Sequence, residues 1–111
     1  AVKVRSEEST LMREETFGPV CRFIGYRSEE EALARINASP YGLAASVWSD
    51  NIRQALRYSE AIDAGIVWVN MHTFLDPAVP FGGMKGSGIG REFGSAFIDD
   101  YTELKSVMVR Y

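Results

Sequence analysis

Short apolar runs alternate along the chain with segments in which apolar and polar residues follow helical spacing. The apolar runs have strand length and occupy Val20 to Tyr26, Leu43 to Trp48 and Ile66 to Val69. The runs are mostly apolar and do not alternate between apolar and polar residues, which predicts strands that are covered on both faces.

The segment after the first strand is predicted to be a helix. Ser28 as N-cap and Glu31 three residues later form a capping box, and Pro40 ends the helical pattern. The apolar residues at helical spacing between them are Ala32, Leu33 and Ile36.

A second helix is predicted between the second and third strands. Ser49 or Asp50 can cap its N-terminus, and Gly65 is its expected C-terminal stop. The positions that follow i, i+3, i+4 and i+7 spacing are Ile52, Ala55, Leu56 and Ser59.

The order β-α-β-α-β predicts an α/β fold, a partial doubly wound, Rossmann-like parallel sheet. Ligands of such sheets gather at the carboxyl ends of the strands. The third strand ends at Asn70 and leads into a glycine-rich loop, so we expect the functional site near this end.

The glycine loop spans Pro80 to Arg91 and holds half of the ten glycines. The order Lys85-Gly86-Ser87 is not that of a P-loop, and the spacing is not GxGxxG. We expect a structural turn with Lys85 and Arg91 as solvated or packing cations, and phosphate binding is the alternative. The five glycines are Gly82, Gly83, Gly86, Gly88 and Gly90.

Beyond the loop, residues 91–101 are expected to form a short helix and Leu104 to Tyr111 a final strand. Val107, Val109 and Tyr111 would share one face of this strand. It has no evident partner in the parallel unit, so pairing with another chain or domain is expected.

Composition limits the class of protein. The 111 residues suit one domain, and 46% hydrophobic with 24% charged residues is typical of a soluble globular protein. A net charge of −3 without a basic stripe argues against nucleic acid as a partner. No apolar run has the length of a membrane span or the features of a signal peptide, so a cytoplasmic protein is expected. The first residue is not methionine, and we expect a fragment of a longer protein.

The only cysteine, Cys21, excludes an internal disulfide and is expected to be a buried packing thiol, with a reactive nucleophile as the alternative. The only histidine, His72, lies far from it, so no metal site is expected. His72 is expected to be a hydrogen-bonded or exposed loop residue, with proton transfer as the alternative.

Four motifs occur together, in order and at characteristic separations. They are EETFGPV at 14–20, YGLAASVWS at 41–49, AGIVWVN at 64–70 and PFGGMKGSGIGRE at 80–92. From about Leu11 to Tyr111 the chain resembles the C-terminal part of the NAD(P)-dependent aldehyde dehydrogenase superfamily. HTFLDPAVPFGG and the last 22 residues resemble the phenylacetaldehyde dehydrogenase branch.

The resemblance implies that residues 1–101 form the C-terminal part of a catalytic domain. Residues 102–111 would then be a terminal strand that joins an intersubunit sheet of a homo-oligomer. The implied cofactor is NAD or NADP, with NAD favoured. The implied reaction oxidises an aldehyde through a cysteine thiohemiacetal, passes hydride to the nicotinamide, and hydrolyses the thioester with a glutamate-activated water.

Particular residues acquire roles by the same resemblance. Glu15 matches the glutamate that hydrogen-bonds the nicotinamide ribose hydroxyls, and Phe17 matches an aromatic residue beside the nicotinamide ring. Phe74, Leu75 and Phe81 match the mouth of the substrate tunnel, where an apolar and aromatic lining suits an aryl aldehyde.

No catalytic residue is expected in this chain, because the resemblance places the nucleophilic cysteine and the glutamate base N-terminal to Glu14. Cys21 does not correspond to that nucleophile. We therefore expect the chain to be inactive alone, as a piece of a dehydrogenase. The alternative is a non-catalytic, truncated module that oligomerises or holds a ligand.

Overall fold

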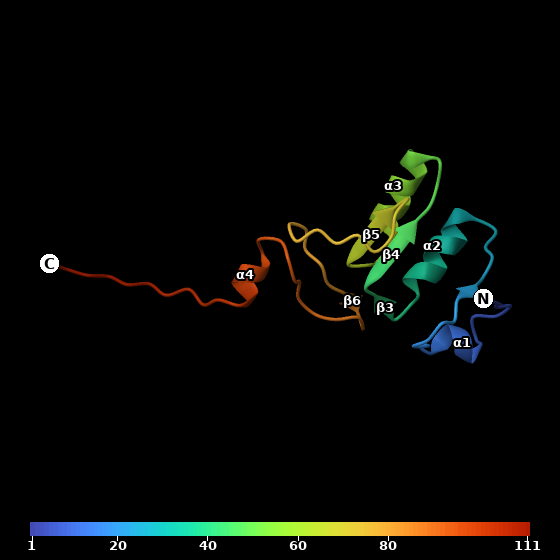
Figure 1. Cartoon of the computed structure of the whole chain (residues 1–111), viewed down its shortest axis with the longest axis horizontal. Coiled ribbons are helices and arrows are strands. Elements are labelled where there is room, and N and C mark those ends of the chain that lie inside the picture. Colours follow the sequence, from blue (N-terminus) through green and yellow to red (C-terminus); the bar gives the residue numbers. More distant parts are fainter. The chain divides into compact units, whose positions relative to one another are not determined.

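The structure, a computed structural model, describes residues 1–111 as two compact units, Ala1–Ala32 and Leu33–Tyr111. Figure 1 gives the order of the helices and strands along the chain. No helix in the structure has both the length and the apolar character that crossing a membrane requires.

The first unit is built on a short parallel pair of strands. Strand β1 (Val2–Lys3) pairs with β2 (Arg22–Phe23), and helix α1 (Thr10–Arg13) lies between them in sequence. Backbone hydrogen bonds extend the pair at both ends, from Val2 N–H to the Cys21 carbonyl and from Val4 N–H to the Phe23 carbonyl. The predicted strand at 20–26 therefore exists, although it is shorter than expected.

The prediction that Cys21 is buried is wrong, because its side chain is exposed. Both residues of β2 are exposed as well. The apolar run predicted a strand with both faces covered, but Val4 and Ala32 are the only buried hydrophobic residues of this unit. Too little apolar structure packs within the unit to enclose the thiol.

Helix α2 (Glu29–Asn37) begins where the capping pattern predicted. The Ser28 hydroxyl accepts a hydrogen bond from the Glu31 N–H at 3.2 Å. The Glu31 carboxylate accepts from the Arg27 N–H at 2.7 Å, one residue before the position that a standard capping box uses. Three glutamates occupy the first turn, where the helix dipole favours negative charge.

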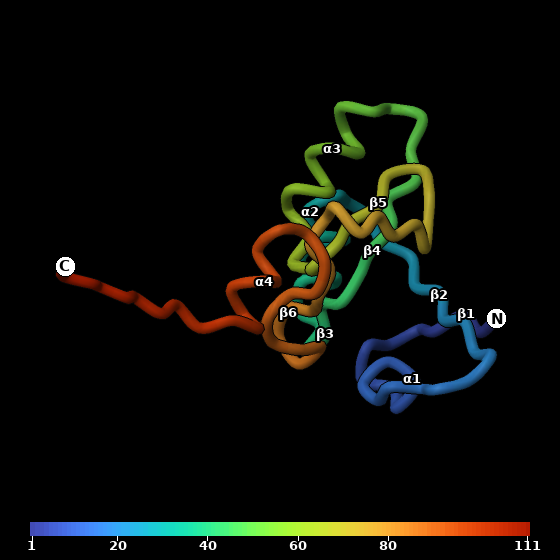
Figure 2. The backbone as a smooth tube through the Cα atoms, turned by 60° about the vertical axis from the view of Figure 1, so that its left-hand side comes forward, coloured from blue at the N-terminus to red at the C-terminus, as the bar shows by residue number.

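The second unit contains the predicted β-α-β segment. Strands β4 (Ala44–Val47) and β5 (Ile66–Val69) pair in parallel, and α3 (Ile52–Ala61) connects them and packs on both. Figures 1 and 2 show the helix alongside the strand pair. Three buried side chains, Ala55, Ile62 and Trp68, form the core of this unit.

The predicted caps of α3 were wrong by a few residues. Asn51 is the N-cap, and its side chain accepts from the Gln54 N–H at 3.2 Å. Ser49 is instead held by Asn70, whose amide group hydrogen-bonds the Ser49 N–H and carbonyl at 2.9 and 3.0 Å. The helix ends before its C-cap Ile62, so Gly65 is not the stop.

The α/β class is confirmed, but the three predicted strands do not form one sheet. The structure has three two-stranded sheets instead. In the first, β2 pairs with β1, and in the second, β4 pairs with β5. The third sheet was not predicted and joins β3 (Tyr41–Gly42) to β6 (Met84–Lys85) in antiparallel fashion. It anchors the glycine loop to the residues just before β4.

The C-terminal part has little regular structure. Helix α4 (Phe97–Asp100) is shorter than the predicted helix at 91–101. Residues 102–111 have no strand pairing, and Figure 1 shows them extended beyond α4. The Leu104 side chain is fully exposed, as is that of Tyr111.

A close approach of two backbones fixes the glycine loop against the turn that precedes β5. A Cβ added at Gly65 would overlap the carbonyl oxygen of Gly82. Gly65 N–H also donates to the Gly42 carbonyl at 2.9 Å. An added Cβ at Gly42 would in turn lie 2.6 Å from the Asp63 carbonyl oxygen.

We expect Gly65→Ala to displace the glycine loop, because a main-chain overlap cannot be relieved by rotating a side chain. The free energy of unfolding should fall by about 1–3 kcal/mol. Hydrogen exchange of the Phe81 and Glu92 amides should accelerate, because these amides hydrogen-bond each other's carbonyls across the loop. Gly18→Ala is the control, since nothing lies within 4 Å of its added Cβ. Equal exchange in the two variants would contradict the close approach.

Candidate functional site

The glycine loop is closed by its own backbone. Phe81 and Glu92 exchange two N–H to carbonyl hydrogen bonds of 2.7 Å, which makes residues 82–91 a closed loop. One guanidinium nitrogen of Arg91 donates inward to the carbonyls of Gly83 and Gly90, at 2.9 and 2.7 Å. Arg91 thus packs on the loop, which supports the structural turn over phosphate binding.

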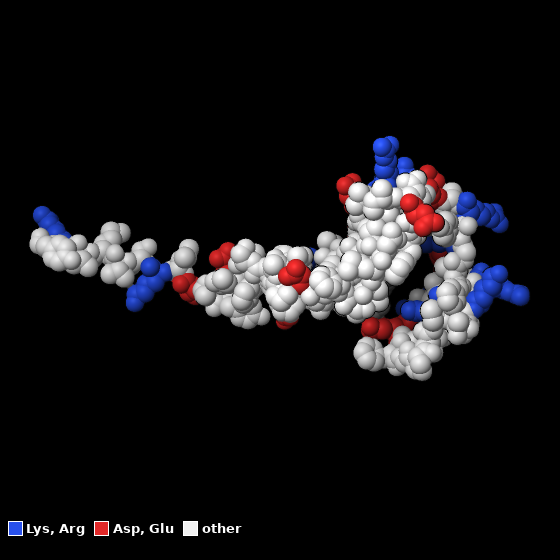
Figure 3. All heavy atoms as spheres, turned by 45° about the horizontal axis from the view of Figure 1, so that its top comes forward, with Lys and Arg blue, Asp and Glu red and all other residues white.

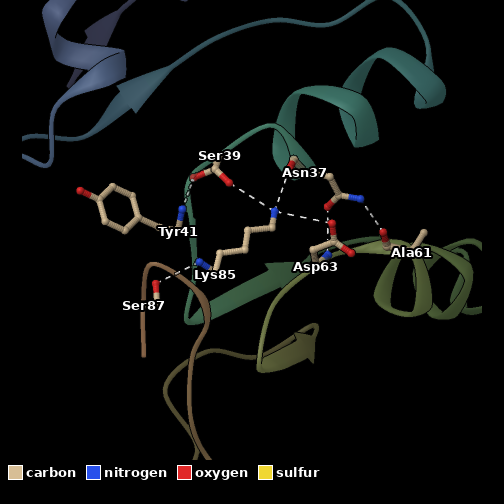
Figure 4. A network of polar contacts seen from close by, with 8 residues as sticks. Asn37, Ser39, Tyr41, Ala61, Asp63, Lys85 and Ser87 are labelled. Carbon is tan, nitrogen blue, oxygen red and sulfur yellow. Dashed lines mark hydrogen bonds and ion pairs between the residues drawn. The ribbon is translucent and has the colours of Figure 1, made fainter. Parts of the chain in front are cut away.

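Lys85 ties the loop to the end of α2 (Figure 4). Its ammonium donates to the carbonyls of Asn37 and Ser39, at 2.7 and 3.3 Å, and lies 3.5 Å from the Asp63 carboxylate. Cations stabilise the carbonyl end of a helix because the dipole and the unpaired carbonyls are negative there. Lys85 is therefore a packing cation, one of the two roles predicted for it.

Asn37 extends this contact to α3. Its side-chain amide donates to the Ala61 carbonyl at 2.7 Å, and its side-chain oxygen accepts from the Asp63 N–H at 2.9 Å. Figure 4 shows the Asn37, Asp63 and Lys85 groups converging between the two helix ends. The Ser87 hydroxyl adds a bond of 3.0 Å from the Gly42 N–H.

A cavity of about 600 Å³ lies against the loop. The loop supplies most of the lining, and Leu43, Glu92, Asp100 and Tyr101 supply the rest. Charges of both signs border it, from Arg91, Glu92 and Asp100. On the face shown in Figure 3, acidic and basic side chains are likewise interspersed.

The three predicted substrate-pocket residues do not share this cavity. Phe81 lies in its lining, whereas Phe74 and Leu75 belong to the segment that follows the carboxyl end of β5. Their side chains are 58% and 46% exposed. Phe74 and Leu75 follow the strand end where ligand contacts were expected, whereas Phe81 adjoins Gly82, which lies against Gly65 before the start of β5.

Two contacts fix the segment after β5, and sequence reasoning did not identify them. The indole N–H of Trp68 donates to the Phe74 carbonyl at 2.7 Å. The Ser46 hydroxyl and Nδ1 of His72 are hydrogen-bonded at 2.6 Å, so His72 is a hydrogen-bonded loop residue as predicted. The apolar pattern of β4 and β5 marks Trp68 only as a core residue.

The predicted cofactor residues lie in the first unit, in the loop after α1. Glu15 is exposed and Phe17 is fully exposed. Arg22 of β2 donates to the carbonyls of Leu11 and Glu14, the latter at 3.4 Å, and so fixes the start of this loop. The sequence marked Arg22 only as part of a strand.

We expect Lys85→Met to loosen the glycine loop while keeping the aliphatic stem. The side chain is 27% exposed, so losing its charged hydrogen bonds should lower the free energy of unfolding by only about 1 kcal/mol. Urea unfolding measures this change. Lys105→Met, in the exposed terminal segment, is the matched control and should change stability by less than about 0.5 kcal/mol. Equal effects would show that the Lys85 contacts are not stabilising.

Comparison with known proteins places these features in a family. The profile of the aldehyde dehydrogenase family matches residues 2–107. The chain is 47% identical to the 2-hydroxymuconic semialdehyde dehydrogenase of Pseudomonas putida, over 95% of this chain and 22% of that protein. It is 44% identical to the phenylacetaldehyde dehydrogenase of Pseudomonas fluorescens, over 91% of this chain and 20% of that protein.

The fold agrees with a solved structure of the same kind. The NAD+ complex of an aldehyde dehydrogenase from Bacillus cereus matches with a TM-score of 0.86 and 45% identity, over 96% of this chain and 22% of that one. The chain thus spans about a fifth of the length of the relatives it matches. By sequence and by fold, the chain belongs to the aldehyde dehydrogenase family.

Proposed function

We propose that this chain forms the C-terminal part of the catalytic domain of an NAD-dependent aldehyde dehydrogenase. We call that whole enzyme the parent polypeptide. The observation that carries the proposal is the agreement with an NAD+-bound aldehyde dehydrogenase over 96% of the chain. The parent polypeptide would oxidise an aldehyde to the carboxylic acid and reduce NAD+.

The cofactor contacts would come from Glu15 and Phe17. An ionised carboxylate has two acceptor oxygens, so Glu15 can accept hydrogen bonds from both hydroxyls of a ribose. The exposed Phe17 ring is free to pack against a nicotinamide. Arg22 holds the carbonyl of the neighbouring Glu14 and thereby supports the position of the Glu15 backbone.

The substrate would be a hydrophobic, aryl aldehyde of the phenylacetaldehyde type. Phe74 and Leu75 supply apolar surface beyond the carboxyl end of β5, where ligands of parallel sheets bind. Phe81 would add apolar surface from the glycine loop. An aryl group that covered the exposed Phe74 ring would remove apolar surface from water, which lowers the free energy of the complex.

The nucleophilic thiolate and the general base would be supplied outside this chain. Cys21 follows the EETFGP motif, whereas family resemblance places the nucleophile before it. The chain would therefore provide walls of the site and be inactive alone.

Residues 102–111 would pair with a strand of a second subunit. They are extended, their backbone groups have no ladder partner in the chain, and Val107 and Val109 expose apolar side chains on one face. Unpaired strand edges of this kind readily add to another sheet. The parent polypeptide would thus be a homo-oligomer.

We expect Glu15→Gln in the parent polypeptide to weaken NAD+ binding about tenfold, because the amide retains only one acceptor oxygen. Titration of NAD+ measures the dissociation constant, and aldehyde-dependent NADH formation measures the activity.

Two controls frame this experiment. Glu14→Gln removes the adjacent carboxylate and should leave NAD+ affinity within about twofold. Residues 1–111 alone should form no NADH from phenylacetaldehyde. Unchanged NAD+ affinity in Glu15→Gln would refute the assigned contact, and NADH formation by the isolated chain would refute its inactivity.

We expect Val109→Pro to break the intersubunit pairing, because proline removes a backbone donor that the strand needs. Sedimentation velocity of the parent polypeptide should then detect smaller oligomers. Val109→Thr keeps the donor and the β-branched shape and should keep the native oligomer. The same sedimentation coefficient for both variants would exclude pairing through this residue.

A further inference from the structure

We propose that Trp68 and the Ser46–His72 pair are positioning residues that set the conformation of residues 70–75, and thereby the aldehyde specificity of the site. This inference rests on the proposed function, in which Phe74 and Leu75 face the substrate. These positioning residues do not contact the aldehyde themselves.

The segment needs outside support because it has no regular structure of its own. Strand β5 ends at Val69, and residues 70–75 belong to no helix or strand. Asn70 and Thr73 adopt φ of 55° and 58°, a region that side-chain-bearing residues rarely occupy. Such conformations persist where surrounding contacts enforce them.

Trp68 supplies the first of these contacts. Its side chain is 7% exposed, so the indole is fixed by packing in the core of the unit. The indole N–H then reaches out of the core to the Phe74 carbonyl at 2.7 Å. A rigid donor that holds the backbone of Phe74 also limits where the Phe74 side chain can lie.

Ser46 and His72 supply the second contact from the neighbouring strand. Ser46 is the register partner of Trp68 in the β4–β5 ladder, so both side chains lie on the same face of the strand pair. The His72 ring accordingly meets both residues. It hydrogen-bonds the Ser46 hydroxyl at 2.6 Å and packs edge-on against the indole, with the ring centroids 5.2 Å apart.

Asn70 fixes where this segment begins. Its N–H donates to the Val47 carbonyl at 2.8 Å, and its amide group holds both backbone groups of Ser49. The segment is thus tied down at its first residue, near its middle at His72, and at Phe74. Removing the later ties should free Phe74 and Leu75 without disturbing the strands.

The test compares Trp68→Phe with the unmodified parent polypeptide. The variant keeps an aromatic ring but loses the N–H donor. We expect chymotrypsin to cleave after Phe74 faster in limited proteolysis, with hydrogen exchange of β5 unchanged. We also expect the KM for phenylacetaldehyde to rise about five- to tenfold, with kcat and the KM for acetaldehyde within twofold.

Further variants separate positioning from loss of packing. Ser46→Ala removes the hydroxyl that anchors His72, at a half-buried site, and should cause smaller changes of the same kind as Trp68→Phe. Ser46→Thr keeps the hydroxyl and should behave like the unmodified enzyme. Trp48→Phe changes a tryptophan that is 67% exposed and should have no effect.

The outcomes distinguish this inference from the proposed function. If the unmodified enzyme does not favour phenylacetaldehyde over acetaldehyde, the proposed substrate class fails, and proteolysis at Phe74 alone then decides the positioning role. If the enzyme does favour phenylacetaldehyde and Trp68→Phe leaves both the rate of proteolysis at Phe74 and the KM ratio unchanged, the inference is overturned. Faster proteolysis with an unchanged KM ratio overturns the specificity role.

Discussion

Close contact between the backbones of glycine residues is the constraint on which the second unit depends. Gly65 leads into β5, Gly42 leads into β4, and Gly82 of the glycine loop lies against Gly65. Glycine permits such an approach because it has no Cβ, although it costs conformational entropy in the folded state. The polar contacts of Lys85 and Ser87 then fix a loop whose position the glycines already allow.

The same framework holds both segments that are candidates for the substrate wall. The glycine loop is attached at the start of the β4–β5 pair, through β3 and β6. Residues 70–75 are attached at the opposite, carboxyl end, through Trp68 and Ser46. Apart from β6, neither segment has regular structure, so each takes its conformation from contacts with strands and helix ends. Functional loops commonly depend on a rigid scaffold in this way.

The pattern of apolar and polar residues predicted the individual helices and strands well, but it predicted poorly which strands pair with one another. The strand at 66–69 and the parallel β-α-β segment are as predicted, because apolar runs and helical spacing are properties of neighbouring residues. The single three-stranded sheet and the buried Cys21 were wrong. A continuous apolar run indicates that something covers a strand but does not identify the cover. The cap at Asn51 was missed because Asn70, about twenty residues away, holds Ser49.

The candidate site was predictable only through family resemblance, which supplied Glu15, Phe17, Phe74, Leu75 and Phe81. The contacts of His72 with Ser46 and Trp68 were not predicted, because they depend on the register between two strands, which no local pattern encodes. The exposure of the apolar residues that the family resemblance supplied gives physical support to a binding role. Phe17 is fully exposed and Phe74 more than half exposed, and each loses about 25 cal/mol of stabilisation for every Å² of apolar surface left in water. A cofactor ring or an aryl substrate that covered these surfaces would recover that free energy. Burial of exposed apolar surface would in this way contribute to the binding affinity.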